Sequence, residues 1–122
     1  MELLLETAKR KNHTFFKVIG ELNYDGALRL KKAFGDALAL GEIFIIIDFT
    51  KCRTVTSFAL SILLRLNDTL KEKKGTLRFI CPSGNVSEVF DVVDVQNIIP
   101  VFATEDELWH FSTGTGSLTI LP

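Results

Sequence analysis

The chain has 122 residues, of which 47% are hydrophobic and 24% are charged, and its formal net charge is −1 at a pI of about 6.1. This length and composition indicate one globular domain, and they exclude a disordered chain and the basic field that nucleic-acid binders use. The chain has no apolar run near the roughly 20 residues of a membrane span, and acids stand where a secretory signal carries Lys or Arg, so we expect a cytoplasmic protein without membrane insertion.

The first predicted element is a β-hairpin. Two apolar segments, residues 2–8 and 13–22, flank a polar turn over residues 9–12. Asn12 tolerates the positive φ that a tight hairpin turn requires. The chain should therefore open with two antiparallel strands.

A helix is predicted from residue 24 to residue 40. Asn23 is a good N-cap, and Asp25 lies in the first turn, where its charge favours the helix dipole. Gly41 is placed to end the helix in a left-handed conformation. The apolar positions that should form the buried face are Ala27, Leu30, Phe34, Ala37 and Leu38.

The central predicted strand covers residues 43–49. Five apolar residues in a row, Ile43 to Ile47, cannot alternate between core and solvent, so the strand should be buried on both faces. A polar turn over residues 50–56 follows, and a helix begins at Ser57. Polar residues on that helix form one stripe, and its other faces are nearly all apolar; the stripe consists of Ser61, Arg65, Asp68 and Glu72.

The rest of the chain continues the alternation of strand and helix. Residues 76–81 read as a strand, followed by a helix from Asn85 or Val86 to Val93 with a capping box between Asn85 and Glu88. Its buried face should carry Val86, Val89, Phe90 and Val93.

A last strand and a last helix are predicted after that. Residues 98–102 form a strand whose Pro100 indicates an edge position, and Thr104 caps a helix over residues 105–111. The order predicts an α/β fold with a mixed, mostly parallel sheet. We assign residues 1–111 to the domain and residues 112–122 to a flexible Gly/Ser/Thr-rich tail, in which residues 118–121 can add a strand to an exposed edge.

The common catalytic and metal-binding motifs are absent from the sequence. His13, His110, Cys52 and Cys81 show no spacing typical of a zinc site. A phosphate-binding loop and a nucleophile elbow are also missing. The two cysteines, at the carboxyl ends of predicted adjacent strands, read as buried apolar residues rather than a disulfide. We therefore expect no enzyme activity, no cofactor and no metal.

One constellation stands out, in the turn before the second helix. In the simplest interpretation Thr56 or Ser57 only caps the helix. In the functional interpretation Ser57 accepts a phosphoryl group, which the free N–H groups and the helix dipole would stabilise. Phe58 would then be a partly exposed aromatic anchor for a partner protein. The residues alone leave both interpretations open.

Several segments together resemble the STAS family, the domain shared by bacterial anti-sigma factor antagonists and the cytoplasmic tails of sulphate transporters. The resemblance covers residues 5–108. Residues 19–23 (Ile-Gly-Glu-Leu-Asn) are similar to the family's Gly-Glu-Leu-Asp start of the first helix, and residues 45–49 to its Val-Leu-Asp-Leu strand. Residues 89–91 resemble its Leu-Phe segment, and residues 98–102 its last strand.

The family signature Asp-Ser-Ser-Gly-Leu matches Thr56-Ser57-Phe58-Ala59-Leu60 here. The resemblance implies that Ser57 is the phosphorylation site, with Thr56 as the second candidate, and that the partner is an anti-sigma factor that is also a serine kinase. Thr56, Phe58 and Ala59 depart from the signature, and Asn23 replaces an Asp. The implied protein is a monomer or weak dimer. Its partner-binding residues would be Asn23, Tyr24, Asp25, Thr54, Thr56, Ser57, Phe58 and Ser61.

Two alternatives remain from the sequence. One is a non-phosphorylated STAS scaffold subunit of a stress-signalling or lipid-transport complex. The other belongs to a different class: a small-ligand binding protein or enzyme that uses Cys52 and Cys81, which requires both thiols and a histidine to converge in one pocket.

Overall fold

The structure, a computed structural model, describes residues 3–113. Its elements alternate between strands and helices after an opening hairpin, as the sequence predicts. In chain order they are β1 (Leu4–Arg10), β2 (His13–Leu22), α1 (Tyr24–Ala39), β3 (Phe44–Asp48), β4 (Cys52–Val55), α2 (Ser57–Glu72), β5 (Thr76–Ile80), α3 (Asn85–Val92), a 3-10 turn (Val95–Asn97), β6 (Val101–Phe102) and α4 (Glu105–Thr113).

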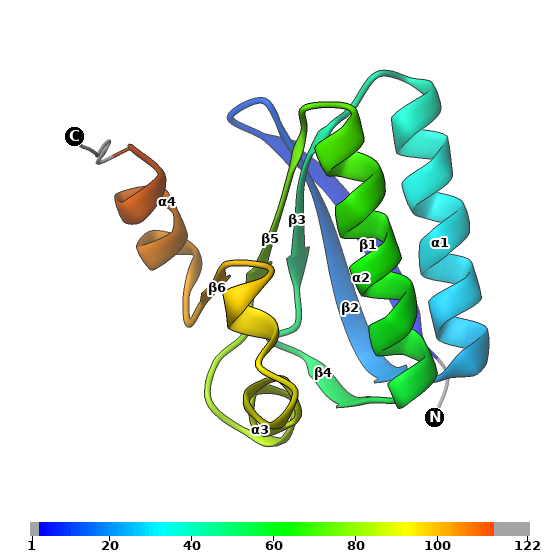
Figure 1. The fold of residues 1–122 in the computed structure, drawn as a ribbon, viewed down its shortest axis with the longest axis vertical. Coiled ribbons are helices and arrows are strands. Elements are labelled where there is room, and N and C mark those ends of the chain that lie inside the picture. The colour runs from blue at the N-terminus through cyan, green and yellow to red at the C-terminus, as the bar shows by residue number, and fades with distance from the viewer. Residues whose placement is uncertain (1–2, 114–122) are drawn as a thin grey trace.

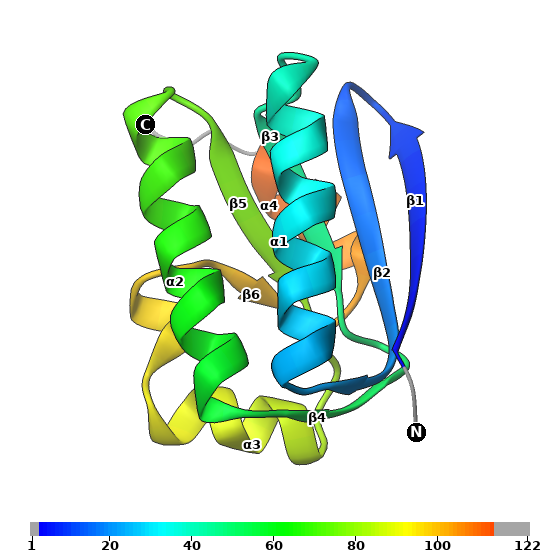
Figure 2. The ribbon, with the colours of Figure 1, turned by 90° about the vertical axis from the view of Figure 1, so that its right-hand side faces the viewer.

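The sheet is mixed and mostly parallel. Its strand order is β1-β2-β3-β5-β6, in which β1 pairs with β2 antiparallel and the other neighbours pair in parallel. Helices α1 and α2 cover one face, and α4 lies against the other (Figures 1 and 2). Helix α3 lies beyond the carboxyl ends of the strands, next to β4 (Figure 1). The predicted α/β architecture is therefore confirmed.

The hairpin turn is shorter than the sequence predicts. Only Lys11 and Asn12 lie between β1 and β2, and both have positive φ values, 53° and 64°. Two consecutive residues with positive φ are typical of the tight hairpin turn whose twist matches that of the strands. The strands thus extend further toward the turn, and Arg10 pairs with His13.

The core confirms burial on both faces for the middle of the central strand, but β3 is one residue shorter at each end than predicted, and Phe44 at its start is 41% exposed. Ile45, Ile46 and Ile47 have no exposed side-chain surface. Ile45 and Ile47 belong to the large cluster under α1 and α2, and Ile46 belongs to a smaller one that contains Leu108 of α4. Because successive residues of a strand face opposite sides, both layers of helices close on β3.

The predicted polar turn over residues 50–56 is wrong in its middle. It contains the short strand β4, which runs parallel to the end of β2 and pairs Leu22 with Val55. The reason is the length of β2: it has ten residues and β3 has five, so the last residues of β2 extend past β3. β4 supplies the hydrogen bonds that this overhang would otherwise lack.

The predicted cap of the third helix is also wrong. The N-cap is Gly84, and its N–H donates to Ser87 Oγ at 2.9 Å, so Asn85 and Glu88 do not form a capping box. Val86 and Phe90 are buried as predicted. Val89 and Val93, however, are 36% and 47% exposed. Of the four residues predicted to form the buried face, only Val86 and Phe90 do so.

The last strand is an edge strand, as Pro100 indicates, but only residues 101 and 102 form it. Ile98 and Ile99 instead follow the 3-10 turn and donate to the Val95 carbonyl at 2.8 Å each. Helix α4 begins as predicted, with Glu107 N–H donating to Thr104 Oγ1 at 3.1 Å. It continues to Thr113, two residues beyond the predicted end; the remainder of the predicted tail, including the possible strand at 118–121, lies outside the described residues. Among residues 3–113 no helix is long and apolar enough to cross a membrane.

Candidate functional site

The turn before α2 is held in place by Thr56. Its N–H donates to the Leu22 carbonyl of β2 at 3.1 Å, and its Oγ1 accepts from Ala59 N–H at 3.2 Å. Thr56 is thus the N-cap of α2, and Ser57 is its first helical residue. The Asp of the family signature is replaced here by a residue that performs the capping role.

Ser57 is exposed, and its hydroxyl has no hydrogen-bond partner within the described part of the chain. The first turn of α2 contains no acidic residue, and the exposed Arg53 precedes it on β4. An accessible hydroxyl at the positive end of a helix dipole, with no carboxylate in that turn, can carry a phosphoryl group at low electrostatic cost.

An exposed aromatic pair lies beside Ser57. Tyr24 of α1 and Phe58 of α2 have ring centroids 4.6 Å apart with 34° between their planes. Tyr24 is 58% exposed and Phe58 is 37% exposed. The two rings bridge the starts of neighbouring helices and present a rigid apolar surface to solvent, the kind of surface that anchors protein partners.

The other predicted binding residues surround this pair in sequence. Asn23 caps α1, with its Oδ1 accepting from Gly26 N–H at 3.0 Å, and Asp25 and Thr54 are exposed. Ser61 Oγ donates to the Phe58 carbonyl at 2.6 Å. The predicted residues therefore lie at the amino ends of α1 and α2 and on the β4 segment that leads into α2. The sequence did not predict the ring contact itself, although each aromatic residue closely follows an N-cap at the start of its helix.

The cysteines are not poised for chemistry. Both are free; Cys81 is buried and Cys52 half-buried. Burial raises the pKa of each thiol to about 11. Cys81 lines a hollow of about 390 Å³ among α3, β6 and α4, but a thiol with that pKa is almost entirely protonated at neutral pH and is a weak nucleophile.

The histidine of the hairpin lies at the other end of the sheet. His13 begins β2, whereas Cys81 follows the carboxyl end of the parallel strand β5. The structure therefore separates His13 from the cysteines. Within residues 3–113 no group of three or more His, Cys, Asp or Glu side chains is arranged to hold a metal ion.

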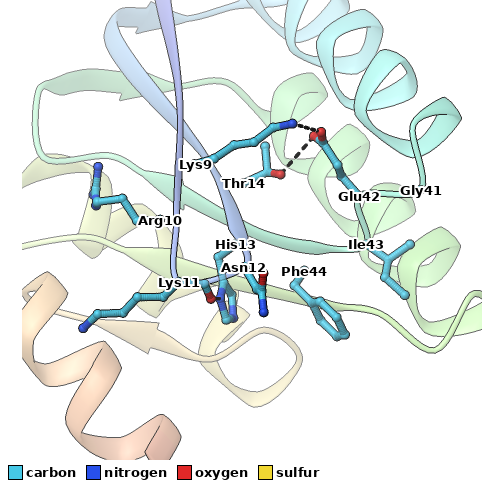
Figure 3. A pocket seen from close by; sticks show the side chains of 10 residues that line it. All are labelled: Lys9, Arg10, Lys11, Asn12, His13, Thr14, Gly41, Glu42, Ile43 and Phe44. Atoms are coloured by element: carbon cyan, nitrogen blue, oxygen red, sulfur yellow. Dashed lines mark hydrogen bonds and ion pairs between the residues drawn. The ribbon is translucent and has the colours of Figure 1, made fainter.

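His13 lines the hollow shown in Figure 3, which has a volume of about 430 Å³ and lies between the hairpin turn and the start of β3. Its polar groups bind one another: Lys9 pairs with Glu42, and Thr14 Oγ1 donates to Glu42 at 3.0 Å (Figure 3). His13 Nε2 is 2.7 Å from an Arg78 guanidinium nitrogen. These contacts join Lys9, Glu42 and Thr14, and His13 with Arg78, into side-chain interactions that tie the hairpin to the segment before β3 and to β5 at this end of the sheet.

Residues 5–108 match the STAS domain family. A comparison with curated proteins gives no match. Among solved structures, the chain is similar to a putative anti-sigma factor antagonist from Thermotoga maritima, with 19% identity, a TM-score of 0.80 and coverage of 87% of this chain and 92% of that one. An anti-sigma factor antagonist from Mycobacterium paratuberculosis shares 17% identity at a TM-score of 0.80, covering 89% and 92%. The phosphorylated form of the Bacillus cell fate determinant SpoIIAA shares 20% identity at a TM-score of 0.67, covering 89% and 97%.

Proposed function

Because this chain belongs to the STAS domain family, we propose that it is a partner-switching regulator similar to anti-sigma factor antagonists. It would bind an anti-sigma factor that is also a serine kinase, and phosphorylation of Ser57 would control that binding. The observation that carries the proposal is the exposed Ser57 hydroxyl, which has no partner among residues 3–113 and lies beside the tilted ring pair of Tyr24 and Phe58. SpoIIAA, a structural neighbour, has been solved in both phosphorylated and unphosphorylated forms, which is consistent with such a switch.

The proposed switch works by electrostatics and desolvation. In the unmodified protein the partner covers the Tyr24 and Phe58 rings and removes their exposed surface from water. A phosphoryl group on Ser57 adds about −1.5 to −2 charges next to those rings. That charge cannot be buried in an apolar interface without a large desolvation cost, so the partner is released.

The proposed mode of action is binding alone, in the cytoplasm, as a monomer or weak dimer, without a cofactor or nucleic acid. Thiol pKa values of about 11 argue against thiolate chemistry at Cys52 and Cys81. The near-neutral charge of the chain argues against binding to phosphate backbones.

The direct test incubates the protein with ATP and each serine-kinase anti-sigma factor encoded in its source genome. Intact-mass analysis should show one added phosphate with the cognate kinase, and peptide mapping should place it on Ser57. Ser57→Ala should abolish the modification, whereas Ser83→Ala, at an exposed position outside the predicted binding residues, should leave it unchanged. No added phosphate with any of these kinases, or a phosphate at another residue, would reject the switch.

The second candidate is the non-phosphorylated STAS scaffold subunit. It is favoured by one observation: Phe58 follows Ser57 directly and its ring contacts that of Tyr24 in a tilted arrangement, so the surface can bind a partner without any modification of Ser57. Binding that is lost in Phe58→Ala but unaffected by ATP would select this candidate. The partner captured, a stress-signalling protein or a transporter ATPase, would then separate its two forms.

A further inference from the structure

The outer edge of β5 is open over its first half. β5 pairs with β6 only through Phe79 and Ile80, and Phe79 N–H donates to the Pro100 carbonyl at 2.9 Å. In a parallel ladder every second residue directs both its N–H and its C=O to the same side. The N–H and C=O of Leu77 therefore point to the same edge as those of Phe79.

The segment that precedes β6 cannot pair with Leu77. In the continued ladder the residue-100 N–H would donate to the Leu77 carbonyl, but proline has no N–H. In the same continued ladder the Leu77 N–H would donate to the Ile98 carbonyl. Ile98, however, has helical φ/ψ, and its own N–H donates to the Val95 carbonyl. In the described part of the chain, Leu77 thus has no strand partner on this side.

A buried amide without a partner lies beside this edge. Asn67 of α2 is only 3% exposed, and its Nδ2 has no hydrogen-bond partner within residues 3–113. It lines a hollow of about 320 Å³, together with Leu77, Ile98 and Pro100. A buried donor that remains unpaired is costly, and such a group at the wall of a hollow indicates an acceptor supplied from outside.

The two sides of the edge differ in chemistry. On the α2 side the hollow is bordered by Leu77, which is packed in the core, and by Ile98, which is 46% exposed. Arg78 points to the opposite face of the sheet, toward His13, whereas Lys71, the second cation in the lining, belongs to α2. None of the described residues that line the hollow is acidic. A strand placed here would meet an apolar surface on one side and a guanidinium on the other.

We propose that this edge binds an extended peptide segment of a partner protein, in which apolar and acidic side chains alternate, as an added strand beside β5. The peptide backbone would pair with the N–H and C=O of Leu77, and one of its carbonyls would accept from Asn67 Nδ2. Its apolar side chains would lie against Leu77 and Ile98, and its acidic side chains would face Arg78. The site lies near the amino end of β5, away from Ser57, and does not depend on the proposed switch.

The test uses the full chain and the synthetic peptide acetyl-Thr-Val-Glu-Val-Glu-Val-Thr-amide as the probe. Titration followed by amide NMR should shift the Leu77 resonance and slow its hydrogen exchange at least tenfold, while the amides of Ser57 and Phe58 stay unchanged. A peptide with Lys in place of each Glu should bind at least tenfold more weakly. Equal binding of the two peptides, or no change at Leu77, would overturn the proposal.

Two variants separate binding from folding. Asn67→Leu removes the unpaired amide, so the urea midpoint should stay equal or rise while the peptide binds about fivefold more weakly, as expected for one lost hydrogen bond. Pro100→Val introduces an N–H that can donate to the Leu77 carbonyl. It should therefore weaken peptide binding without lowering the urea midpoint. Asn85→Leu, at an exposed position on α3, is the matched control and should change neither value.

Two outcomes identify another explanation. Asn67→Leu that lowers the urea midpoint and leaves the peptide affinity unchanged would make Asn67 a structural residue and overturn its role. Slow exchange of Leu77 in the free full chain, lost on truncation after Thr113, would mean that the chain's own residues 114–122 occupy the edge, and the partner peptide would be rejected.

Discussion

The two ends of the sheet both expose a phenylalanine, yet they differ in what surrounds it. Phe44 is 41% exposed at the amino end of β3, and Phe58 is 37% exposed at the start of α2. Near Phe44 the polar side chains bind each other, as Lys9 does with Glu42 and His13 with Arg78. Near Phe58 the Ser57 hydroxyl has no partner in the described chain, and the exposed ring of Tyr24 contacts Phe58.

This difference shows that exposure by itself does not mark a site. Around Phe44, the Lys9–Glu42 ion pair and the hydrogen bond from Thr14 to Glu42 already engage these side chains within the chain, so a partner that bound there would have to break them. At the Ser57 end, the N-caps satisfy the backbone and leave the hydroxyl and the rings available. The end whose groups remain available is the one that can gain most from binding.

The largest expected effect compares the two ends of the central strand. Phe49, only 2% exposed, packs edge-to-face against Phe79 and Phe90 at centroid distances of 4.9 and 5.2 Å. Phe49→Ala should lower the free energy of unfolding by about 3–5 kcal/mol through the cavity it leaves. Phe44→Ala should cost less than about 1 kcal/mol. Urea denaturation measures the free energy of unfolding of both variants. Equal decreases would show that the strand is not packed more tightly at its Phe49 end than at its Phe44 end.

The next effect concerns binding rather than stability. Phe58→Ala should weaken binding to the proposed anti-sigma factor by about 2 kcal/mol, roughly thirtyfold in affinity, as for an aromatic anchor that becomes buried in the complex. Phe44→Ala is the matched control, since its ring is similarly exposed at the other end. Surface plasmon resonance should find its affinity unchanged. A similar loss in both variants would remove the distinction between the two ends.

The cap of α2 should give a smaller effect. Thr56→Ala removes the acceptor for Ala59 N–H and should lower the free energy of unfolding by about 1 kcal/mol. Thr56→Ser keeps that acceptor and should restore most of the stability in thermal unfolding. If Thr56→Ser were as destabilising as Thr56→Ala, the cap would not be what holds the turn.

The smallest effect is a pH dependence at the amino end. Burial lowers the pKa of His13 below 6.5 against the opposing effect of its hydrogen bond to the Lys11 carbonyl, and the charge of Arg78 lowers the pKa further. The unfolded chain therefore binds a proton at His13 more readily than the folded one. Stability should fall as the pH decreases from 6.5 through the folded-state pKa. His13→Gln should reduce this slope when urea denaturation is repeated across this pH range.

Much of this arrangement can be predicted from sequence because it depends on local signals. Capping chemistry indicates the helix ends at Asn23, Thr56 and Gly41. The run of apolar residues from Ile43 to Ile47 predicts the central strand. The strand β4 is not predictable in this way, because it exists only to pair with the overhanging end of β2. Such pairing depends on the relative lengths of strands that are distant in sequence.

The same limit applies to the functional residues. Ser57 can be predicted from its place at a helix start, but the contact between the Tyr24 and Phe58 rings requires α1 and α2 to lie side by side. Asn67 left a signal that is visible in retrospect: it lies off the polar stripe of α2, among apolar residues. Whether such a residue is satisfied within the chain depends on three-dimensional contacts.

The central claim is that charge at Ser57 disrupts an interface that the unmodified turn makes. Isothermal titration calorimetry with the cognate serine-kinase anti-sigma factor tests it most directly, comparing the unmodified chain with Ser57→Asp and with Ser61→Asp. Ser57→Asp should bind about 100-fold more weakly, near 3 kcal/mol, while Ser61→Asp, one turn away, should lose much less. Ser57→Asp with an affinity within twofold of the unmodified chain would contradict the account.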